Sequence, residues 1–328
     1  MTMFIHLKIN ILMIAFIGAI LFTSCVETLI SVRVHPDGRY TMEYVTRGDS
    51  ADVFNHDFPH PSGTIWKTRI EKKPGEKEDI WIMTTTGMTR GPLVFTSRED
   101  SLTSLQHPFQ ITRTKSFFNT RYTLKNAFKG RRVYSKYPKF GKSLQESDSD
   151  STQWMSEAFY YMYSTGIQDL QNDPETQIDS LLSDRIINSI RNTLAHIDQR
   201  ELFSELEDKQ HFLDQMLRPF QNDLPVGYVT LLSHATDIYE EELRLTNELR
   251  DDQFQYWAFM PGAITSTNAD TIVGDTLKWS FGLSEYMNDD YVIEAASIVY
   301  SSKRIQTTIL IAAGLLLIML YLFYRRGR

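Results

Sequence analysis

The sequence predicts an α+β fold: an antiparallel sheet built from N- and C-terminal strands, a helical insertion between them, and one C-terminal transmembrane helix. Strand-like alternation of apolar and polar residues, punctuated by turn residues, occurs early and late in the chain. Between residues 154 and 250 the apolar spacing changes to that of amphipathic helices. A run of twenty uncharged residues then precedes a basic end.

These patterns divide the 328 residues into six segments. We expect a lipoprotein-type signal peptide, a β-rich part, a helical insertion, a β-rich closing part of the same domain, a transmembrane helix and a cytoplasmic tail. The predicted ranges are 1–24, 25–145, 146–252, 253–304, 305–324 and 325–328.

Turn chemistry predicts the early strands. Residues 29–35 and 39–45 alternate on either side of Pro36-Asp37-Gly38, and the segments TIWKTRIEKK and IWIMTTT flank the turn PGEKED in the same way. Residues 109–128 predict one long strand or two. Phe117 beside Phe118 breaks the alternation there, as a bulge or a turn would.

Three helices are expected in the insertion. Asp173-Pro174-Glu175 is typical of a helix start, residues 198–201 resemble a second N-terminal cap, and a third helix is predicted from Pro225 to Arg250. Amphipathic helices ordinarily bury their apolar face, so we expect these stripes to form a core rather than a cofactor or partner site.

Strands return from Gln253, with Gly274-Asp275 as the last hairpin signal and residues 291–300 as the last strand. If one membrane holds both ends of the chain, the strand after Cys25 leaves that membrane and the last strand returns to it. We therefore expect these two strands in one sheet, antiparallel if adjacent, with Leu29 and Val299 at the same end of the fold.

Cys25 is the only cysteine, and it follows the twelve-residue apolar run ILMIAFIGAILF and Thr23-Ser24. Twelve residues suit the core of a signal peptide and are too few to span a bilayer. The step into cysteine resembles a bacterial lipobox, although Phe22 replaces the usual leucine. The pattern predicts lipidation of Cys25; the alternative is an uncleaved signal anchor with a buried thiol.

The run from Ile305 to Tyr324 is long enough for one hydrocarbon core, with Lys303 and Arg304 before it and RRGR after it. Secretion of the N-terminus then predicts that residues 26–304 face the extracytoplasmic side, which is the periplasm where two membranes are present. The protein is expected in a bacterial cell membrane with its C-terminus in the cytoplasm.

All 41 acidic residues lie between Glu27 and Glu294, and four basic residues lie in the terminal segments. The middle therefore carries 30 basic against 41 acidic residues, a net charge of about −11, which argues against nucleic acid as a partner. A single cysteine excludes an intramolecular disulfide.

Four features together resemble LppM-like bacterial envelope lipoproteins: the lipobox-like Cys25, the hairpin around VHPDGRY, the closing MPGAITSTNADTIVGDTLKW and the terminal membrane helix. The resemblance covers the opening and closing parts of the ectodomain. It implies a membrane-anchored domain of mixed sheet and helix, with lipid binding proposed for some relatives. It brings no catalytic residues.

Two chemical functions, ester hydrolysis and zinc binding, are considered and not favoured. Gly48-Asp49-Ser50 and Asp57-Phe58-Pro59-His60 look like fragments of GDS-type esterase blocks, but an antiparallel hairpin precedes Ser50 and the intervening blocks are missing. Zinc could use the aspartates and histidines of the same loop, yet nothing in their spacing guarantees convergence. We expect no metal, no cofactor and no catalytic residues. The side chains concerned are Asp49, Asp52, His56, Asp57 and His60.

The remaining signal is compositional: Ser101 to Gln145 contains ten basic residues, no acidic ones and interleaved aromatic residues. Anionic lipid headgroups are the predicted ligand, with binding assigned to Lys129, Arg131, Arg132 and Lys136. The alternative is a charged strand face that acidic residues of the helical insertion cover.

The leading functional prediction is therefore a membrane-anchored extracytoplasmic lipoprotein that binds lipid or another envelope component. The alternative is a scaffolding envelope protein that recruits protein partners through its helical insertion. An esterase-type hydrolase comes third, and the sequence names neither the ligand nor the cellular process.

Overall fold

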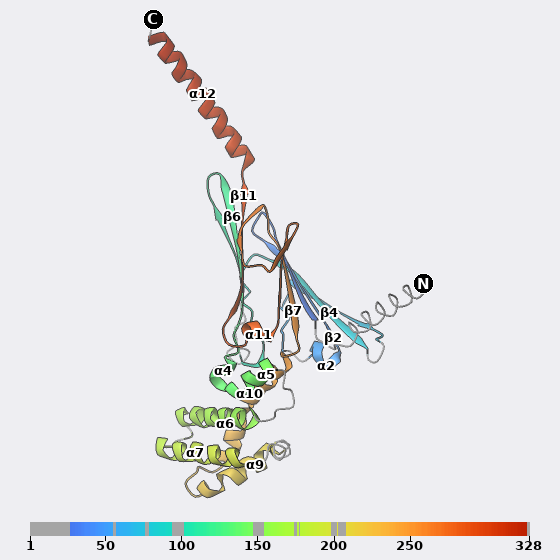
Figure 1. Cartoon of the computed structure of the whole chain (residues 1–328), viewed down its shortest axis with the longest axis vertical. Coiled ribbons are helices and arrows are strands. Elements are labelled where there is room, and N and C mark those ends of the chain that lie inside the picture. Colours follow the sequence, from blue (N-terminus) through green and yellow to red (C-terminus); the bar gives the residue numbers. More distant parts are fainter. Residues whose placement is uncertain are drawn as a thin grey trace, which may run out of the picture.

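The computed structural model describes residues 27–54, 57–75, 79–93, 102–146, 154–173, 176, 178–197, 202 and 208–326. Two sheets form a body, a helical module lies at one end of it, and a long C-terminal helix leaves the other end (Figure 1). The predicted α+β class is confirmed. Signal peptide, Cys25 and the last two residues of the tail lie outside the described residues.

The larger sheet has seven strands in the order β3-β4-β2-β1-β7-β10-β9. The strand β1 pairs antiparallel with β2 but parallel with β7, so this sheet is mixed. The strands are β1 (Glu27–Val34), β2 (Tyr40–Gly48), β3 (Trp66–Lys73), β4 (Ile80–Thr89), β7 (Gln253–Phe259), β9 (Thr271–Val273) and β10 (Thr276–Phe281).

The smaller sheet is antiparallel, in the order β5-β6-β11-β8. Its strands are β5 (Phe109–Lys115), β6 (Asn119–Phe128), β8 (Ala263–Thr267) and β11 (Tyr291–Tyr300). Residues 109–128 therefore form two strands, and the break at Phe117 and Phe118 is a turn. The carbonyl of Asn119 accepts a hydrogen bond from the Ser116 amide at 2.8 Å, which closes it.

The predicted hairpins form where glycine permits them. Gly38 has φ 89° in the β1–β2 turn and Gly274 has φ 63° in the β9–β10 turn, a left-handed region that other residues rarely adopt.

Aromatic side chains fill the space between the two sheets. Tyr40 of β2 contacts Phe109 of β5 with ring centroids 4.7 Å apart, and Phe128 of β6 contacts Phe281 of β10 at 4.6 Å. All four are buried. Burying large aromatic surfaces is the main favourable term that holds the sheets together.

The helical module, residues 155–248, has its own buried cluster, separate from that of the body. Asp179 caps α7 by accepting a hydrogen bond from the Leu182 amide, so the predicted start at Asp173 is wrong by six residues. The predicted cap at 198–201 lies outside the described residues, and Asp208 caps the next helix. The module comprises α6 (Met155–Asn172), α7 (Ser180–His196), α9 (Lys209–Leu217), the 3-10 turn η2 (Arg218–Phe220) and α10 (Tyr228–Glu248).

Among the described residues, five further helices belong to the body or follow it. Helices α4 and α5 were not predicted, because residues 25–145 were expected to form a β-rich part. They are α2 (Ser50–Phe54), α4 (Val133–Lys136), α5 (Pro138–Glu146), α11 (Leu283–Tyr286) and the C-terminal α12 (Ser302–Arg326).

One topological prediction is wrong: β1 and β11 lie in different sheets. They also run the same way, because Arg33 near the end of β1 pairs with Phe259, and Gly262 just beyond contacts Val299 near the end of β11. Leu29 and Val299 are thus at opposite ends. A parallel β1–β7 pair needs a long crossover connection, and everything from β2 to α10 supplies it.

Candidate membrane-proximal surface and the predicted basic site

Helix α12 has the properties of a membrane span. Its 25 residues reach roughly 38 Å at 1.5 Å per residue. The mean hydropathy of its apolar 18-residue window is 2.2, and none of that window is buried against the rest of the protein. A buried core helix and an N-terminal signal sequence give similar patterns, but α12 is exposed and C-terminal. The predicted C-terminal apolar helix is confirmed as a candidate span.

The start of α12 is tied to the turn between β5 and β6. The Ser301 amide donates a hydrogen bond to the carbonyl of Phe118 at 2.8 Å. One helical turn later, Arg304 donates from Nη1 to the carbonyl of Phe117 at 3.0 Å, and its guanidinium carbon lies 5.6 Å from the ring centroid of Phe117. The hairpin tip and the first turn of α12 therefore form one surface, which we call the α12 end of the body (Figure 1).

Both aromatic residues of this tip face away from the core. Phe117 is 64% exposed and Phe118 42% exposed, and their rings pack edge to face with centroids 4.8 Å apart. Lys115, Arg121 and Lys303 surround the tip; all are exposed, and none forms an ion pair with another described residue.

The four residues predicted to bind headgroups lie at the other end of β6, next to the helical module. They follow Phe128, which pairs with Tyr291 at the start of β11, whereas the aromatic tip lies beside Tyr300 at the end of β11. We call this the module end of the body. Lys129 forms an ion pair there with Asp290, 2.6 Å from Nζ to Oδ2, and Arg132 is exposed with φ 56°.

Arg131 is only 4% exposed. Its Nη2 atom donates to the carbonyls of Leu102 at 3.0 Å and Glu242 at 3.2 Å, and its Nε donates to the Thr246 hydroxyl at 3.2 Å. Burial lowers the pKa of Arg131, and the nearby carboxylate of Glu242 opposes that shift.

Lys136 forms an ion pair with Glu242, and the two side chains are 15% and 2% exposed. Burial lowers the pKa of Lys136 while Glu242 acts in the opposite direction. An acidic residue of the helical insertion thus covers two of the four cations, as the alternative reading expected. Headgroup binding by the four residues stays a prediction.

The histidines and aspartates weighed for zinc or hydrolysis do not converge in the described part of the chain, where no three potential ligands form a group. His60 hydrogen-bonds through its two ring nitrogens to Thr46 and Thr85, each at 2.9 Å, and burial lowers its pKa to about 4. Ser50 begins the five-residue helix α2 after an antiparallel strand. His56 lies outside the described residues.

Sequence reasoning missed one ionisable residue at the module end. Asp252 is 4% exposed, and burial together with the neighbouring carboxylates of Asp57 and Asp52 raises its pKa to about 8. Its only sequence signal is its position directly before the strand β7.

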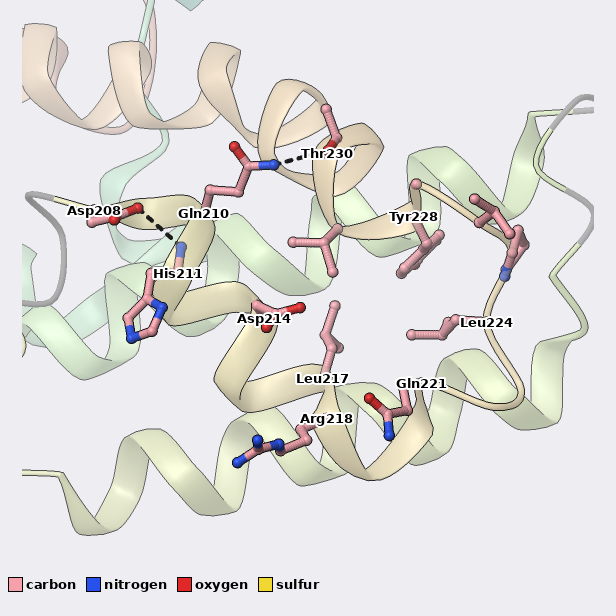
Figure 2. Close-up of a pocket in the computed structure, with 14 residues that line it drawn as sticks. Asp208, Gln210, His211, Asp214, Leu217, Arg218, Gln221, Leu224, Tyr228 and Thr230 are labelled. Atoms are coloured by element: carbon pink, nitrogen blue, oxygen red, sulfur yellow. Dashed lines mark hydrogen bonds between the residues drawn. The ribbon is translucent and has the colours of Figure 1, made fainter.

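A pocket of about 660 Å³ opens in the helical module between α9 and the beginning of α10 (Figure 2). Asp208 accepts a hydrogen bond from the His211 amide at 3.0 Å on one side, and Gln210 donates to the Thr230 hydroxyl at 2.9 Å. Val226, in the loop that closes the other side, is fully exposed. The polar rim and the exposed apolar loop suit contact with a protein surface.

Comparisons with known proteins return little. No family model matches the chain, and no curated protein matches it. Among solved structures, the NMR structure of the folded domain of Mycobacterium tuberculosis LppM is similar at 9% sequence identity, with a TM-score of 0.31, over 86% of this chain and 95% of that one.

Proposed function

We propose that the protein is a membrane-anchored bacterial envelope protein that holds its helical module in the extracytoplasmic space for a protein partner. One observation carries the proposal: the module and the candidate span α12 lie at opposite ends of the two-sheet body (Figure 1). A body fixed at the α12 end displaces the module from the bilayer.

The interior of the body favours a supporting role over that of a lipid carrier. Tyr44, Tyr122, Phe128, Tyr256 and Trp279 are at most 1% exposed, and they occupy the space between the sheets where an acyl chain would have to lie. Protein interiors packed in this way leave few voids larger than a water molecule.

Apolar side chains are exposed on the surface of the helical module. Leu181 is 75% exposed, Leu231 is 44% exposed and Val226 is fully exposed beside the pocket of Figure 2. Exposed apolar residues rimmed by polar ones are typical of protein interaction sites. Lipidation of Cys25 stays a separate prediction and is not part of this proposal.

The test is photo-crosslinking in intact cells, with a photoreactive amino acid placed in the full chain at Val226 or Leu231. We expect the same protein adduct from both positions. Ile70, 47% exposed on the edge strand β3, provides the matched control, since it lies on the body with similar exposure. The proposal would be refuted if the yield of protein adduct at Val226 and Leu231 were no higher than that at Ile70, or if these positions formed adducts with lipid alone.

A further inference from the structure

The aromatic hairpin tip at the α12 end has no role in the proposed function, which is to hold the helical module for a protein partner. Phe117 and Phe118 place two adjacent exposed rings on a turn whose strands need neither of them, since β5 ends at Lys115 and β6 begins at Asn119. A solvent-facing turn ordinarily carries glycine, asparagine or other polar residues. Two phenylalanines there indicate a surface that water does not cover.

We propose that Phe117 and Phe118 insert into the headgroup layer of the membrane that α12 crosses, so that the β5–β6 hairpin is a second membrane contact. The inference rests on α12 spanning a membrane, as the proposed function requires. Its occupant is the bilayer itself, because the tip is continuous with the span.

The depth of the tip follows from its hydrogen bonds to α12. Phe118 is bonded to Ser301 and Phe117 to Arg304, whereas the uncharged run begins at Ile305. One helical turn is about 5.4 Å long, and each headgroup layer is roughly 5–7 Å thick. The tip therefore lies at the level of the headgroups when Ile305 enters the hydrocarbon.

The charges around the tip agree with that placement. Lys115, Arg121 and Lys303 are exposed without ion-pair partners among the described residues, and Arg304 packs over the Phe117 ring. Cations at this level attract lipid phosphates, and aromatic rings are enriched at membrane interfaces. Tyr300, 59% exposed beside the tip, extends the same aromatic group.

The consequence is mechanical. A single helix would leave the body free to swing about Ser301, whereas a helix and an inserted hairpin hold it by two contacts. The second contact would fix the direction in which the helical module points.

The test measures depth by spin labelling of the full chain in vesicles made from equal parts of phosphatidylcholine and phosphatidylglycerol. Cys25→Ala removes the native thiol, and single cysteines are introduced at Ser116 beside the tip, at Leu316 in α12 and at Val226 in the module. Oxygen and a water-soluble nickel chelate report depth. We expect label 316 to be deep, label 226 to be aqueous, and label 116 to show a severalfold lower nickel accessibility than label 226.

The double variant F117S/F118S should raise the nickel accessibility of label 116, because serine removes the inserted rings while the hydrogen bonds from α12 to the backbone carbonyls remain, and leucine at both positions should restore the low value. An unchanged accessibility of label 116 in F117S/F118S would overturn the insertion of the two rings. Phe54→Ser is the matched control, because Phe54 is 41% exposed at the end of helix α2, where its ring packs against Trp81 of β4 in the larger sheet. An aqueous label 116 with a deep label 316 overturns the inference and leaves the anchor intact. Aqueous labels at both positions overturn both, and spin–spin broadening between 116 labels would assign the tip to contact between copies instead.

Discussion

The two ends of the two-sheet body differ in the burial and the partners of their charged side chains. At the module end, Arg131, Glu242 and Asp252 are at most 4% exposed and held among protein groups. At the α12 end, Lys115 and Arg121 are exposed on the protein surface and form no ion pairs among the described residues. The difference shows that a basic run of sequence has no single role, because β6 carries its residues from one end of the body to the other.

The largest expected effect concerns Asp252 at the module end. Its pKa is about 8 in the folded protein, whereas an aspartate in an unfolded chain titrates near 4. Between these values the folded state retains a proton that the unfolded state has lost, so stability falls as pH rises from about 4 to about 8. At about 1.4 kcal/mol per pKa unit, the loss approaches about 5 kcal/mol.

Asp252→Asn should abolish this loss, because asparagine stays neutral. Urea unfolding at pH 4 and pH 8 measures the change: the variant and the parent should match at pH 4 and diverge at pH 8. Asp251→Asn is the control, since its side chain is 66% exposed. Burial also lowers the pKa values of His60 and His107, to about 4 and about 3, which weakens the fold below about pH 6.5 equally in all variants. Parallel pH profiles for D252N and the parent would contradict the assignment.

The second prediction concerns the largely buried charged residues that join the body to the module, Arg131, Lys136 and Glu242. Glu242→Gln removes the carboxylate that pairs with Lys136 and leaves buried cations without this counter-charge, which costs about 3 kcal/mol of unfolding free energy. Glu241→Gln on the same helix is the control: Glu241 pairs with Arg244 at the surface, where a pair contributes at most about 1 kcal/mol.

A rescue variant separates charge from packing. In K136M/E242Q the buried ammonium is gone as well, so the double variant should be more stable than E242Q alone. If E242Q and E241Q unfold at the same denaturant concentration, the module end is held by packing alone and the contrast between the two ends loses its electrostatic basis.

The position of Cys25 in the sequence, two residues before β1, bears on the comparison between the module end and the α12 end. Glu27, two residues after Cys25 in the sequence, pairs with Gln253 at the module end. A lipid on Cys25 and a span at α12 would therefore hold opposite ends of the body. If both enter one bilayer, the body must lie along it, which is a different orientation from the one expected of α12 and the hairpin tip alone.

Local chemistry accounts for what the sequence could predict. Pro36-Asp37-Gly38 and Gly274 set their turns within a few residues, and the apolar spacing of residues 228–248 is sufficient to define α10. The division into two sheets could not be predicted, because the parallel pairing of β1 with β7 joins strands more than 200 residues apart. The start of α7 was misplaced since Asp173 and Asp179 are equally good caps by composition. The buried state of Arg131 depends on Glu242 and Thr246, 111 and 115 residues away in the chain.

The smallest expected effect tests whether solvent exposure alone decides how much an ion pair contributes to the free energy of unfolding. Lys129 belongs to the same predicted basic group as Lys136 and also has a carboxylate partner, but its pair with Asp290 is 51% and 42% exposed. Water and salt screen such a pair, so Lys129→Gln should change the unfolding free energy by no more than about 0.5 kcal/mol.

The measurement is urea unfolding at low and high salt, with Lys136→Gln in parallel. Because Lys136 neutralises a buried carboxylate, its substitution should cost several times more, and that cost should persist in salt. Equal and salt-sensitive losses for the two lysines would mean that Lys136 and Glu242 are solvated in the native state, and the module end would then be no more closed to water than the α12 end.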